Sequence, residues 1–321
     1  MTRYVVTGGA GFIGSHIAER LLREGHQVRV VDNLSSGREQ NLGPLLETYG
    51  PQLEFHRVSI TDSTALPEVF DGVDVIYHQA ALPSVPRSIE NPLETHEQCA
   101  TGTLRVLIAA RDAGVRRVVY AASSSAYGDV EGETAVAKHE AMPPHPISPY
   151  GVAKLTGEYY CQMFTTVYGL ETVCLRYFNV FGPRQDPKSQ YAAVIPLFIQ
   201  AILSGQPPTI YGDGLQSRDF TYIDNIVHAN LLAAASPDAA GEVMNVALGK
   251  TITLCALVDQ INALLGTDIQ PVHAPPRAGD IRYSMADISK ATELLDYAPV
   301  VDFETGLART LEYYRSQMEL I

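Results

Sequence analysis

The sequence predicts an α/β fold, in which a doubly wound parallel sheet is followed by a smaller mixed α/β lobe. Three observations predict it. Over residues 1–180, apolar runs typical of strands alternate with amphipathic runs typical of helices. A glycine-rich turn joins the first strand to the first helix. After Arg176 the alternation becomes irregular, with Gly-Pro and Pro-Pro pairs between short segments.

The elements of the first part alternate along the chain, as a parallel sheet with crossover helices requires. Apolar runs predict strands at Tyr4–Thr7, Val28–Val31, Leu53–Val58, Val75–His78, Val118–Ala121 and Thr172–Arg176. Amphipathic runs predict helices at Phe12–Glu24, Thr64–Phe70, Pro92–Asp112 and Pro149–Tyr168. Together these elements predict one domain over residues 1–176.

The later part of the chain is expected to form a substrate-binding lobe from residues 177–223 and 247–321. Short helices are expected in it at Val194–Leu203 and Leu254–Leu265. Residues 224–246 are expected to return to the first lobe, as a helix at Asp224–Ala235 and a strand at Glu242–Val246. The smaller lobe should close over the carboxyl edge of the sheet, where open α/β sheets bind ligands.

Composition narrows the classes of partner. The 36 acidic residues exceed the 23 Lys and Arg, for a net charge of −13, which argues against nucleic acid and anionic membranes. Four separated cysteines without a Cys-x-x-Cys pair indicate reduced thiols and a cytoplasmic protein, and we assign no metal site. The chain starts almost directly in a strand, so no signal peptide is expected, and its apolar runs fall short of the about 20 residues that span a bilayer.

The first strand leads into Gly8-Gly9-Ala10-Gly11-Phe12-Ile13-Gly14, a dinucleotide-binding fingerprint of the Rossmann type. Gly8 allows the tight turn, Gly11 admits the pyrophosphate, and Gly14 lets the helix pack closely. Free N–H groups at the start of that helix would face the phosphates. Asp32 ends the second strand 18 residues later, where a carboxylate binds the adenosine ribose and favours NAD over NADP. Arg38, in the same loop, could reverse that preference.

Other strand ends are expected to line the same cofactor. Small alanines after the fourth strand would let the backbone lie against it, and His78 is either part of the site or a packed core histidine. The remaining expected cofactor residues are Asn33, Ser35, Ser59, Ile60, Gln79, Ala80, Ala81, Ala121 and Tyr177.

Tyr150-Gly-Val-Ala-Lys154 places a phenol and an ammonium one helical turn apart on the same face. A phenol with a pKa of about 10 is a poor base at neutral pH. Lys154 and the positive nicotinamide of NAD would favour the tyrosinate, which could then accept a proton from an alcohol while hydride leaves its carbon. The fingerprint and this pair together indicate hydride chemistry on an alcohol.

These motifs resemble those of the extended short-chain dehydrogenases/reductases, and the UDP-sugar 4-epimerases most closely. The matching segments run in the family's order from residue 5 to residue 287: Thr7–Gly14, Asp32–Gly37, His78–Ala81, Ser123–Gly128, Tyr150–Lys154, Arg176–Arg184, Tyr211–Gly214, Arg218–Phe220 and Arg277–Asp280. Ser59 and Cys99 depart from the pattern, which commonly has an aspartate and an asparagine there. Both departures bear on cofactor-side packing.

The resemblance implies 4-epimerisation of a UDP-hexose through a transient 4-keto sugar, with NAD bound. Ser123 would be the third catalytic residue beside Tyr150 and Lys154. Related dehydratases carry an acidic pair after this strand, because eliminating water needs a proton donor and a base. Ser124 and Ser125 stand there instead, as expected sugar contacts, which disfavours a dehydratase.

The resemblance also implies how the UDP-sugar would be held. Arginines would bind the diphosphate, an aspartate the ribose, and a tyrosine the uracil. The expected substrate residues in this group are Arg218, Arg277, Asp280, Asn179 and Tyr211, with backbone groups of Ala192–Ile195 and so of Ala193 and Val194.

Sugar specificity is expected to depend on one small residue. By resemblance, Ser284 walls the sugar pocket beside C2, where a small side chain leaves room for an N-acetyl group; a register one residue earlier would put Tyr283 there. Ser84–Ser88 resembles the subgroup that handles N-acetylhexosamines. We therefore expect UDP-GlcNAc and UDP-GalNAc to interconvert, alongside UDP-glucose and UDP-galactose.

Two other functions stay open. A non-enzymatic NAD-binding regulator would have a degraded Tyr-x-x-x-Lys pair, which this chain does not. A UDP-glucuronate decarboxylase or epimerase would need a cation aimed at C6, for which Arg87 is the candidate; carbon dioxide release would identify a decarboxylase.

A homodimer is also expected from the resemblance. The helices at Pro92–Asp112 and Pro149–Tyr168 would pair across a two-fold axis. The apolar residues expected to face outward are Leu104, Leu107, Ile108, Leu155 and Tyr159.

Overall fold

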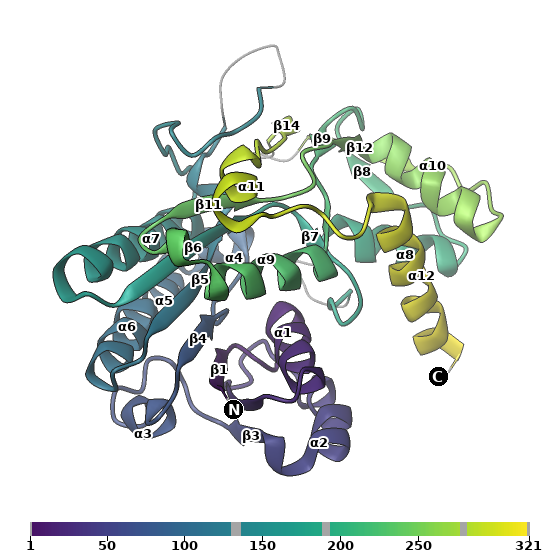
Figure 1. Cartoon of the computed structure of the whole chain (residues 1–321). Helices are drawn as coiled ribbons and strands as arrows, with labels where there is room; N and C mark the ends of the chain where they lie inside the picture. The colour runs from purple at the N-terminus through teal and green to yellow at the C-terminus, as the bar shows by residue number, and fades with distance from the viewer. Residues whose placement is uncertain (1, 130–135, 188–192, 277–280, 320–321) are drawn as a thin grey trace.

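The computed structural model describes residues 2–129, 136–187, 193–276 and 281–319, and its centre is a seven-stranded parallel sheet (Figure 1). The strand order is β11-β6-β5-β4-β1-β2-β3. The strands are β1 (Arg3–Thr7), β2 (Gln27–Val31), β3 (Leu53–His56), β4 (Val75–His78), β5 (Arg117–Ser123), β6 (Glu171–Tyr177) and β11 (Val243–Val246). The expected α/β class is confirmed, and β3 ends two residues earlier than the sequence predicted.

All six neighbouring pairs in this sheet are parallel. The order reverses direction between β1 and β4, because β2 and β3 extend to one side and β5 and β6 to the other. A crevice forms at such a point beyond the carboxyl ends of the strands. The chain returns to this sheet after a long excursion, when β11 pairs with β6.

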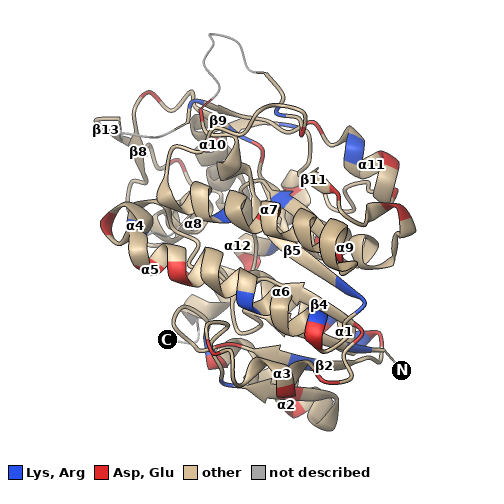
Figure 2. Cartoon of the chain, turned by 90° about the vertical axis from the view of Figure 1, so that its left-hand side faces the viewer, with Lys and Arg blue, Asp and Glu red and all other residues tan. Residues whose placement is uncertain are grey.

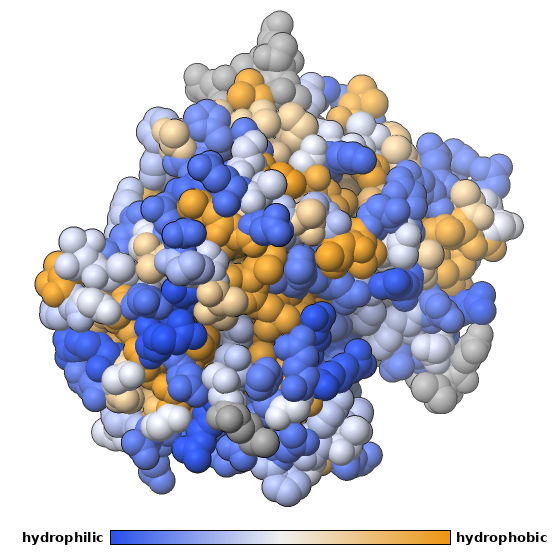
Figure 3. All heavy atoms as spheres, viewed as in Figure 1, coloured by the Kyte–Doolittle hydropathy of each residue, from blue (hydrophilic) through white to orange (hydrophobic). Residues whose placement is uncertain are grey.

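Helices cover both faces of the sheet, and alternate strand residues point to the two layers. Val5 and Val118 belong to the core beneath α3 (Leu66–Phe70), α6 (Gly102–Asp112) and α7 (Pro149–Tyr168). Val6 and Val119 belong to the core beneath α1 (Phe12–Arg23), α2 (Gly43–Tyr49) and α9 (Ile223–Ala235). Figure 2 looks onto the first of these layers, and the space-filling view in Figure 3 shows hydrophobic residues gathered over α9 in the middle of the other face.

The predicted helix at Pro92–Asp112 is continuous but not uniformly α-helical. It begins as α5 (Pro92–His96), widens into a π-helical turn at Glu97–Thr101, and continues as α6. The buried thiol of Cys99 lies in the wide turn and accepts a hydrogen bond from the Leu82 backbone N–H at 3.4 Å. The widened turn therefore packs against the loop that follows β4, at the edge of the crevice.

The second lobe is built from short strands and helices above that edge. Three strands pair as β12 (Ile252–Thr253), β9 (Ser217–Arg218) and β14 (Tyr283–Ser284), and two smaller sheets join β10 (Thr221–Tyr222) to β7 (Val180–Phe181) and β13 (Val272–Ala274) to β8 (Thr209–Tyr211). Helices α8 (Val194–Leu203), α10 (Leu254–Leu265) and α12 (Phe303–Glu319) pack together beside them. Two further helices are α4 (Val85–Glu90) and α11 (Ser289–Leu295).

A single buried carboxylate joins the segments of this lobe. Asp219 is fully buried and accepts backbone N–H bonds from Leu248 and Gly249 at 3.0 Å and from Ala286 at 3.3 Å. These hydrogen bonds stabilise the ionised carboxylate and so lower its pKa. The loss of solvation on burial is the larger effect, and it raises the pKa of Asp219 to about 6.

Asp219 should make the stability of the fold pH-dependent. The pKa of this carboxyl is higher in the folded chain than its ordinary value of 3.8. Its contribution to the free energy of unfolding is therefore fully present below pH 3.8 and is lost as the pH rises through about 6. The loss amounts to about 3 kcal/mol. An Asp219→Asn variant cannot titrate, so its unfolding free energy relative to wild type should rise by about 2 kcal/mol from about pH 4 to about pH 7, because the remainder of the change lies below pH 4.

Urea unfolding at the two pH values measures this difference. Asp259→Asn, at an exposed position on α10, is the matched control and should track wild type at both. A constant offset between Asp219→Asn and wild type would contradict the prediction.

Candidate functional site

Two cavities meet beyond the carboxyl ends of the central strands. The first, of about 530 Å³, follows the point where the sheet order reverses, and the second, of about 310 Å³, extends into the smaller lobe. Asn179, Val180 and Ala193 line both. A molecule bound in one cavity can therefore touch a molecule bound in the other.

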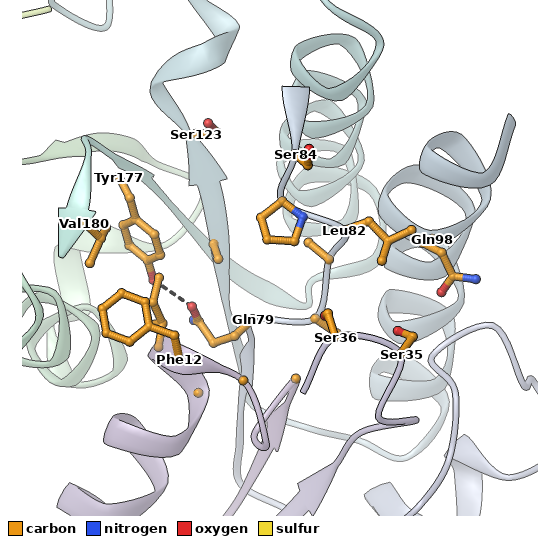
Figure 4. A pocket seen from close by; sticks show the side chains of 18 of the residues that line it. Phe12, Ser35, Ser36, Gln79, Leu82, Ser84, Gln98, Ser123, Tyr177 and Val180 are labelled. Carbon is orange, nitrogen blue, oxygen red and sulfur yellow. Dashed lines mark hydrogen bonds between the residues drawn. The ribbon is translucent and has the colours of Figure 1, made fainter. Parts of the chain in front are cut away.

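The glycine turn forms the floor of the first cavity and has no room for side chains. Gly8 has a positive φ of 67°, and a Cβ on Gly14 would lie 2.3 Å from the Gly8 carbonyl oxygen. Gly11 lines the cavity directly before α1, whose first residue is Phe12 (Figure 4). The backbone can thus approach a ligand closely, and the helix N-terminus favours its phosphates. These residues fit a dinucleotide.

Asp32 lies in the first cavity at the end of β2. Its carboxylate accepts the backbone N–H of Ala10 at 3.0 Å and that of Leu34 at 2.8 Å, and burial raises the pKa of the group. Gly37 packs directly against it, since a Cβ there would lie 2.6 Å from a carboxylate oxygen. The remaining lone pairs of this carboxylate are suited to accept ribose hydroxyls.

Most of the other expected cofactor residues also line the first cavity. They are Phe12, Ile13, Asn33, Ser35, Ile60, Gln79, Ala80, Ala81, Ala121, Tyr150, Lys154 and Tyr177. Ser59 is not among the lining residues, and its hydroxyl pairs with that of Thr61 at 2.8 Å. His78 is a packed core histidine: its ring nitrogens bond the hydroxyls of Thr7 and Thr103, and burial lowers its pKa to about 3.

The start of α7 brings the phenol and the ammonium to the cavity. Ser148 caps this helix by accepting the Gly151 N–H at 3.1 Å, which leaves Tyr150 in the first turn. Lys154 is buried one turn later and donates to the Ala121 carbonyl of β5 at 2.7 Å. The same ammonium lies over the Tyr120 ring, 4.8 Å from the ring centre.

The protein alone does not ionise Tyr150. Burial raises the pKa of this phenol, and the hydrogen bond to Ser123 only partly opposes the rise. Burial likewise lowers the pKa of Lys154. The expected tyrosinate therefore needs the positive charge of an oxidised nicotinamide in addition to the lysine.

The serines that follow β5 form a tight polar turn beside Tyr150. Ser123 is the last residue of the strand; its hydroxyl accepts the Ser125 N–H at 3.2 Å and donates to the Ser125 hydroxyl at 3.0 Å. Ser123, Ser124 and Ser125 all line the first cavity. Among the described lining residues of the two cavities, the only carboxylates are Asp32 and Asp186, so none stands at the serine turn.

The opposite wall is fixed by a hydrogen-bonded triangle. The Tyr177 hydroxyl contacts Gln79 at 3.2 Å, the bond drawn in Figure 4, and Asn230 of α9 at 2.8 Å. Asn230 also contacts Gln79 at 3.2 Å. Asn230, on the helix α9 that covers one face of the sheet, thereby holds the side chains of Tyr177 and Gln79 in place at the cavity.

The second cavity combines an apolar wall with polar side chains at its rim. Tyr211, Arg218 and Val194 line it, together with Phe198 and Leu254. Asn179, in a left-handed backbone conformation with φ of 34°, holds the junction by donating to the Asp219 carbonyl at 3.1 Å.

Ser284 lies behind the wall of the cavities instead of on it. It is buried in β14, opposite Arg218 of β9, and its hydroxyl is 3.5 Å from the Asn179 amide nitrogen. Arg277, Asp280 and Ala192 lie outside the described residues. Ser84 and Arg87 line the first cavity, where Ser84 caps α4.

Arg87 differs from the free cation expected for an acidic sugar, because its guanidinium pairs with Glu94 at 3.0 Å. Sequence reasoning also missed several lining residues, namely Leu82, Pro83, Gln98, Val180, Arg184, Gln185 and Asp186. The Gly-Pro pair before Arg184 marks a turn, but nothing in the pattern of residues 184–186 places them against the first cavity.

The described residues contain no group of three or more His, Cys, Asp or Glu side chains that could hold a metal ion. No described helix combines the length and apolar character needed to cross a membrane.

Comparisons with known proteins agree with this geometry. Residues 4–247 match the NAD dependent epimerase/dehydratase family. A UDP-glucose 4-epimerase of Mycolicibacterium smegmatis is 38% identical over 320 residues, covering 99% of this chain and 100% of that protein. A UDP-N-acetylglucosamine 4-epimerase of Methanobrevibacter ruminantium, solved with UDP-N-acetylmuramic acid, is 41% identical with a TM-score of 0.92 and 99% coverage of both chains.

A UDP-glucuronic acid 4-epimerase of Bacillus cereus, solved with UDP-glucuronic acid and NAD, is 31% identical with a TM-score of 0.90, covering 98% of this chain and 100% of that one. The NAD in that complex is the kind of dinucleotide that the glycine turn and Asp32 of this chain fit. The chain therefore belongs to the NAD dependent epimerase/dehydratase family, takes NAD as its cofactor, and is similar to the UDP-sugar 4-epimerases within that family.

Proposed function

We propose that this protein is a UDP-hexose 4-epimerase that interconverts UDP-GlcNAc and UDP-GalNAc, together with UDP-glucose and UDP-galactose. One observation carries the proposal: Ser123, Tyr150 and Lys154 stand together in the first cavity, and no described carboxylate lines that cavity at the serine turn. A base that can return the proton is present, while the acid pair that dehydration needs is replaced by Ser124 and Ser125.

Each residue of this trio has a distinct task in the proposal. Tyr150 accepts the proton of the sugar 4-hydroxyl and later returns it. Ser123 hydrogen-bonds that hydroxyl and orients it. Lys154, anchored on the Ala121 carbonyl, holds the nicotinamide ribose and adds positive charge near the phenol. NAD, when bound, supplies the ring that takes a hydride from C4 and returns it to the opposite face of the 4-keto sugar.

The second cavity is assigned to the UDP part of the substrate. Tyr211 can stack on the uracil, and Arg218 can form charge-assisted bonds to the diphosphate. Arg277 and Asp280 are assigned to the diphosphate and ribose, and Ala193 and Val194 to the uracil edge, on the resemblance alone. Firm binding of the nucleotide leaves the sugar free to turn over between its two orientations.

Room for an N-acetyl group is inferred at the junction of the cavities. Ser284 is small, and its hydroxyl reaches the Asn179 side chain that lines both cavities. A larger residue at 284 would push Asn179 into the sugar site. The paired state of Arg87 argues against an acidic sugar, although a relative with that substrate exists.

A homodimer is proposed through the layer of α4, α5, α6 and α7. Its exposed apolar side chains include Ile89 and Leu93, which are 64% and 83% accessible, and Val152 and Tyr159 of α7. Leu107 was wrongly expected in this set: it is fully buried in the core, because it faces the sheet.

A cytoplasmic location is also proposed. The four cysteines are free thiols, which suits the reducing cytoplasm.

The substrate proposal predicts how a bulky residue at position 284 divides the substrates. Ser284→Tyr should lower turnover of UDP-GlcNAc and UDP-GalNAc by at least about 100-fold, because the larger side chain behind Asn179 pushes that residue into the space proposed for the acetyl group. UDP-glucose and UDP-galactose should stay within about threefold of wild type. Chromatography of each UDP-hexose after incubation measures both.

Ser316→Tyr, on the exposed side of α12, is the matched control and should leave the turnover of all four substrates as in wild type.

Tyr150→Phe should abolish every interconversion. Wild-type protein that epimerises UDP-galactose but leaves UDP-GlcNAc untouched would overturn the acetyl assignment. Release of carbon dioxide from UDP-glucuronate would instead identify a decarboxylase.

Cofactor retention is a second expectation, because the cycle returns its hydride and NAD never has to leave. NAD should copurify with the protein and appear on acid release. The chain has no tryptophan, so the near-ultraviolet absorbance of reduced nicotinamide should be visible once a UDP-hexose traps part of it. Protein that is inactive until NADP is added would contradict this.

The dimer proposal predicts a mass of twice the chain by light scattering at micromolar concentration. A Leu93→Glu and Tyr159→Glu double variant should be monomeric, because it puts charges into an apolar interface. Val300→Glu, at an exposed apolar position between α11 and α12, should remain dimeric. A monomeric wild type would refute the assignment.

A further inference from the structure

An ion pair crosses the mouth of the first cavity. The guanidinium of Arg38, in the loop after β2, pairs with the carboxylate of Asp186, in the segment after β7. Both residues line the cavity, and their side chains are only 38% and 30% accessible. The Arg38 backbone N–H bonds the Ala10 carbonyl at 3.0 Å, so this arginine is held beside the glycine turn.

The position of Arg38 bears directly on the choice of dinucleotide. In this type of fold, a carboxylate at the end of the second strand favours NAD, and an arginine nearby accommodates the 2′-phosphate of NADP. This chain has both features, as Asp32 and Arg38. The two carboxylate oxygens of Asp32 already accept the N–H groups of Ala10 and Leu34, which offset part of its negative charge. If the Arg38 guanidinium were unpaired, its attraction for a 2′-phosphate would therefore outweigh the repulsion from Asp32.

Asp186 is held in a fixed segment of the chain. The preceding Arg184 pairs with Glu19 and reaches Ser15 at 3.3 Å, both on α1. Between them, the Gln185 carbonyl accepts the hydroxyl of Tyr314 on α12. The carboxylate of Asp186 thus stands at the cofactor cavity because α1 and α12 hold the residues before it.

We propose that Asp186 is a cofactor-selectivity residue, which excludes NADP by neutralising Arg38. A 2′-phosphate carries about two negative charges at neutral pH and would form strong bonds to a free guanidinium. When Arg38 is paired with Asp186, the 2′-phosphate meets no net positive charge and must displace the Asp186 carboxylate to reach the guanidinium. NAD, with only a hydroxyl at that position, is not opposed. The proposal concerns cofactor binding and is independent of which sugar the enzyme converts.

The test is a competition between the two dinucleotides. The full-length protein is incubated with equal excess NAD and NADP until exchange is complete, freed of unbound cofactor, and treated with acid, and the released dinucleotides are quantified by chromatography. Wild type should hold almost only NAD. Asp186→Asn should shift the bound ratio toward NADP by about tenfold or more. Arg38→Ala combined with Asp186→Asn should restore the preference for NAD, because the guanidinium is gone.

Asp224→Asn is the matched control, since it breaks another partly exposed ion pair, with Arg309, outside both cavities. It should keep the wild-type ratio, as should Asp186→Glu. An exposed ion pair contributes little to stability, so the variants are expected to fold; Asp186→Ser serves as a second neutral variant if Asp186→Asn does not. An unchanged ratio in the folded neutral variant would overturn the proposal, and so would an equal shift in the double variant.

Discussion

The site depends first on how helix α7 is fixed to the sheet. The buried Lys154 ammonium bonds the Ala121 carbonyl of β5, and a turn later Glu158 forms a two-pronged ion pair with Arg176 of β6, at 2.7 and 2.9 Å. Gly157 lies between them and admits the Tyr120 hydroxyl, which would lie 2.3 Å from any Cβ there. Helix and strands therefore approach closely, which sets Tyr150 against Ser123.

Burying these charges carries a cost that a purely structural helix would avoid. A buried ion pair is a weak source of stability, because desolvation offsets most of its attraction. Here the buried charges instead fix the positions of Tyr150 and Lys154, the groups assigned to the proposed reaction: Lys154 cannot leave the Ala121 carbonyl without exposing an unpaired ammonium to the core. The same burial raises the pKa of Tyr150, so the phenol stays protonated until a positive ring lies beside it. In the proposed reaction, Tyr150 would therefore become a base only when oxidised NAD is bound.

Local patterns predicted much of the fold and of the cofactor cavity. The glycine turn, Asp32, Tyr150 and Lys154 could be found because each motif acts through short-range backbone geometry. Strand and helix bounds agreed to within about two residues, since apolar periodicity sets them. The wide turn at Cys99, the burial of Leu107 and the Arg87–Glu94 pair could not be found, because each depends on which neighbour a helix meets.

The sequence by itself determined the fold class, the family and which residues are proposed to react, because these follow from motifs whose spacing lies within single turns of helix or strand. Tertiary structure alone decided what surrounds those groups. It joined Arg38 to Asp186, bonded Gln79 to Asn230, and put Ser284 behind Asn179 instead of on the cavity wall. These partners lie more than a hundred residues apart in the sequence, and only the packing of helices and lobes in the folded chain brings them within bonding distance.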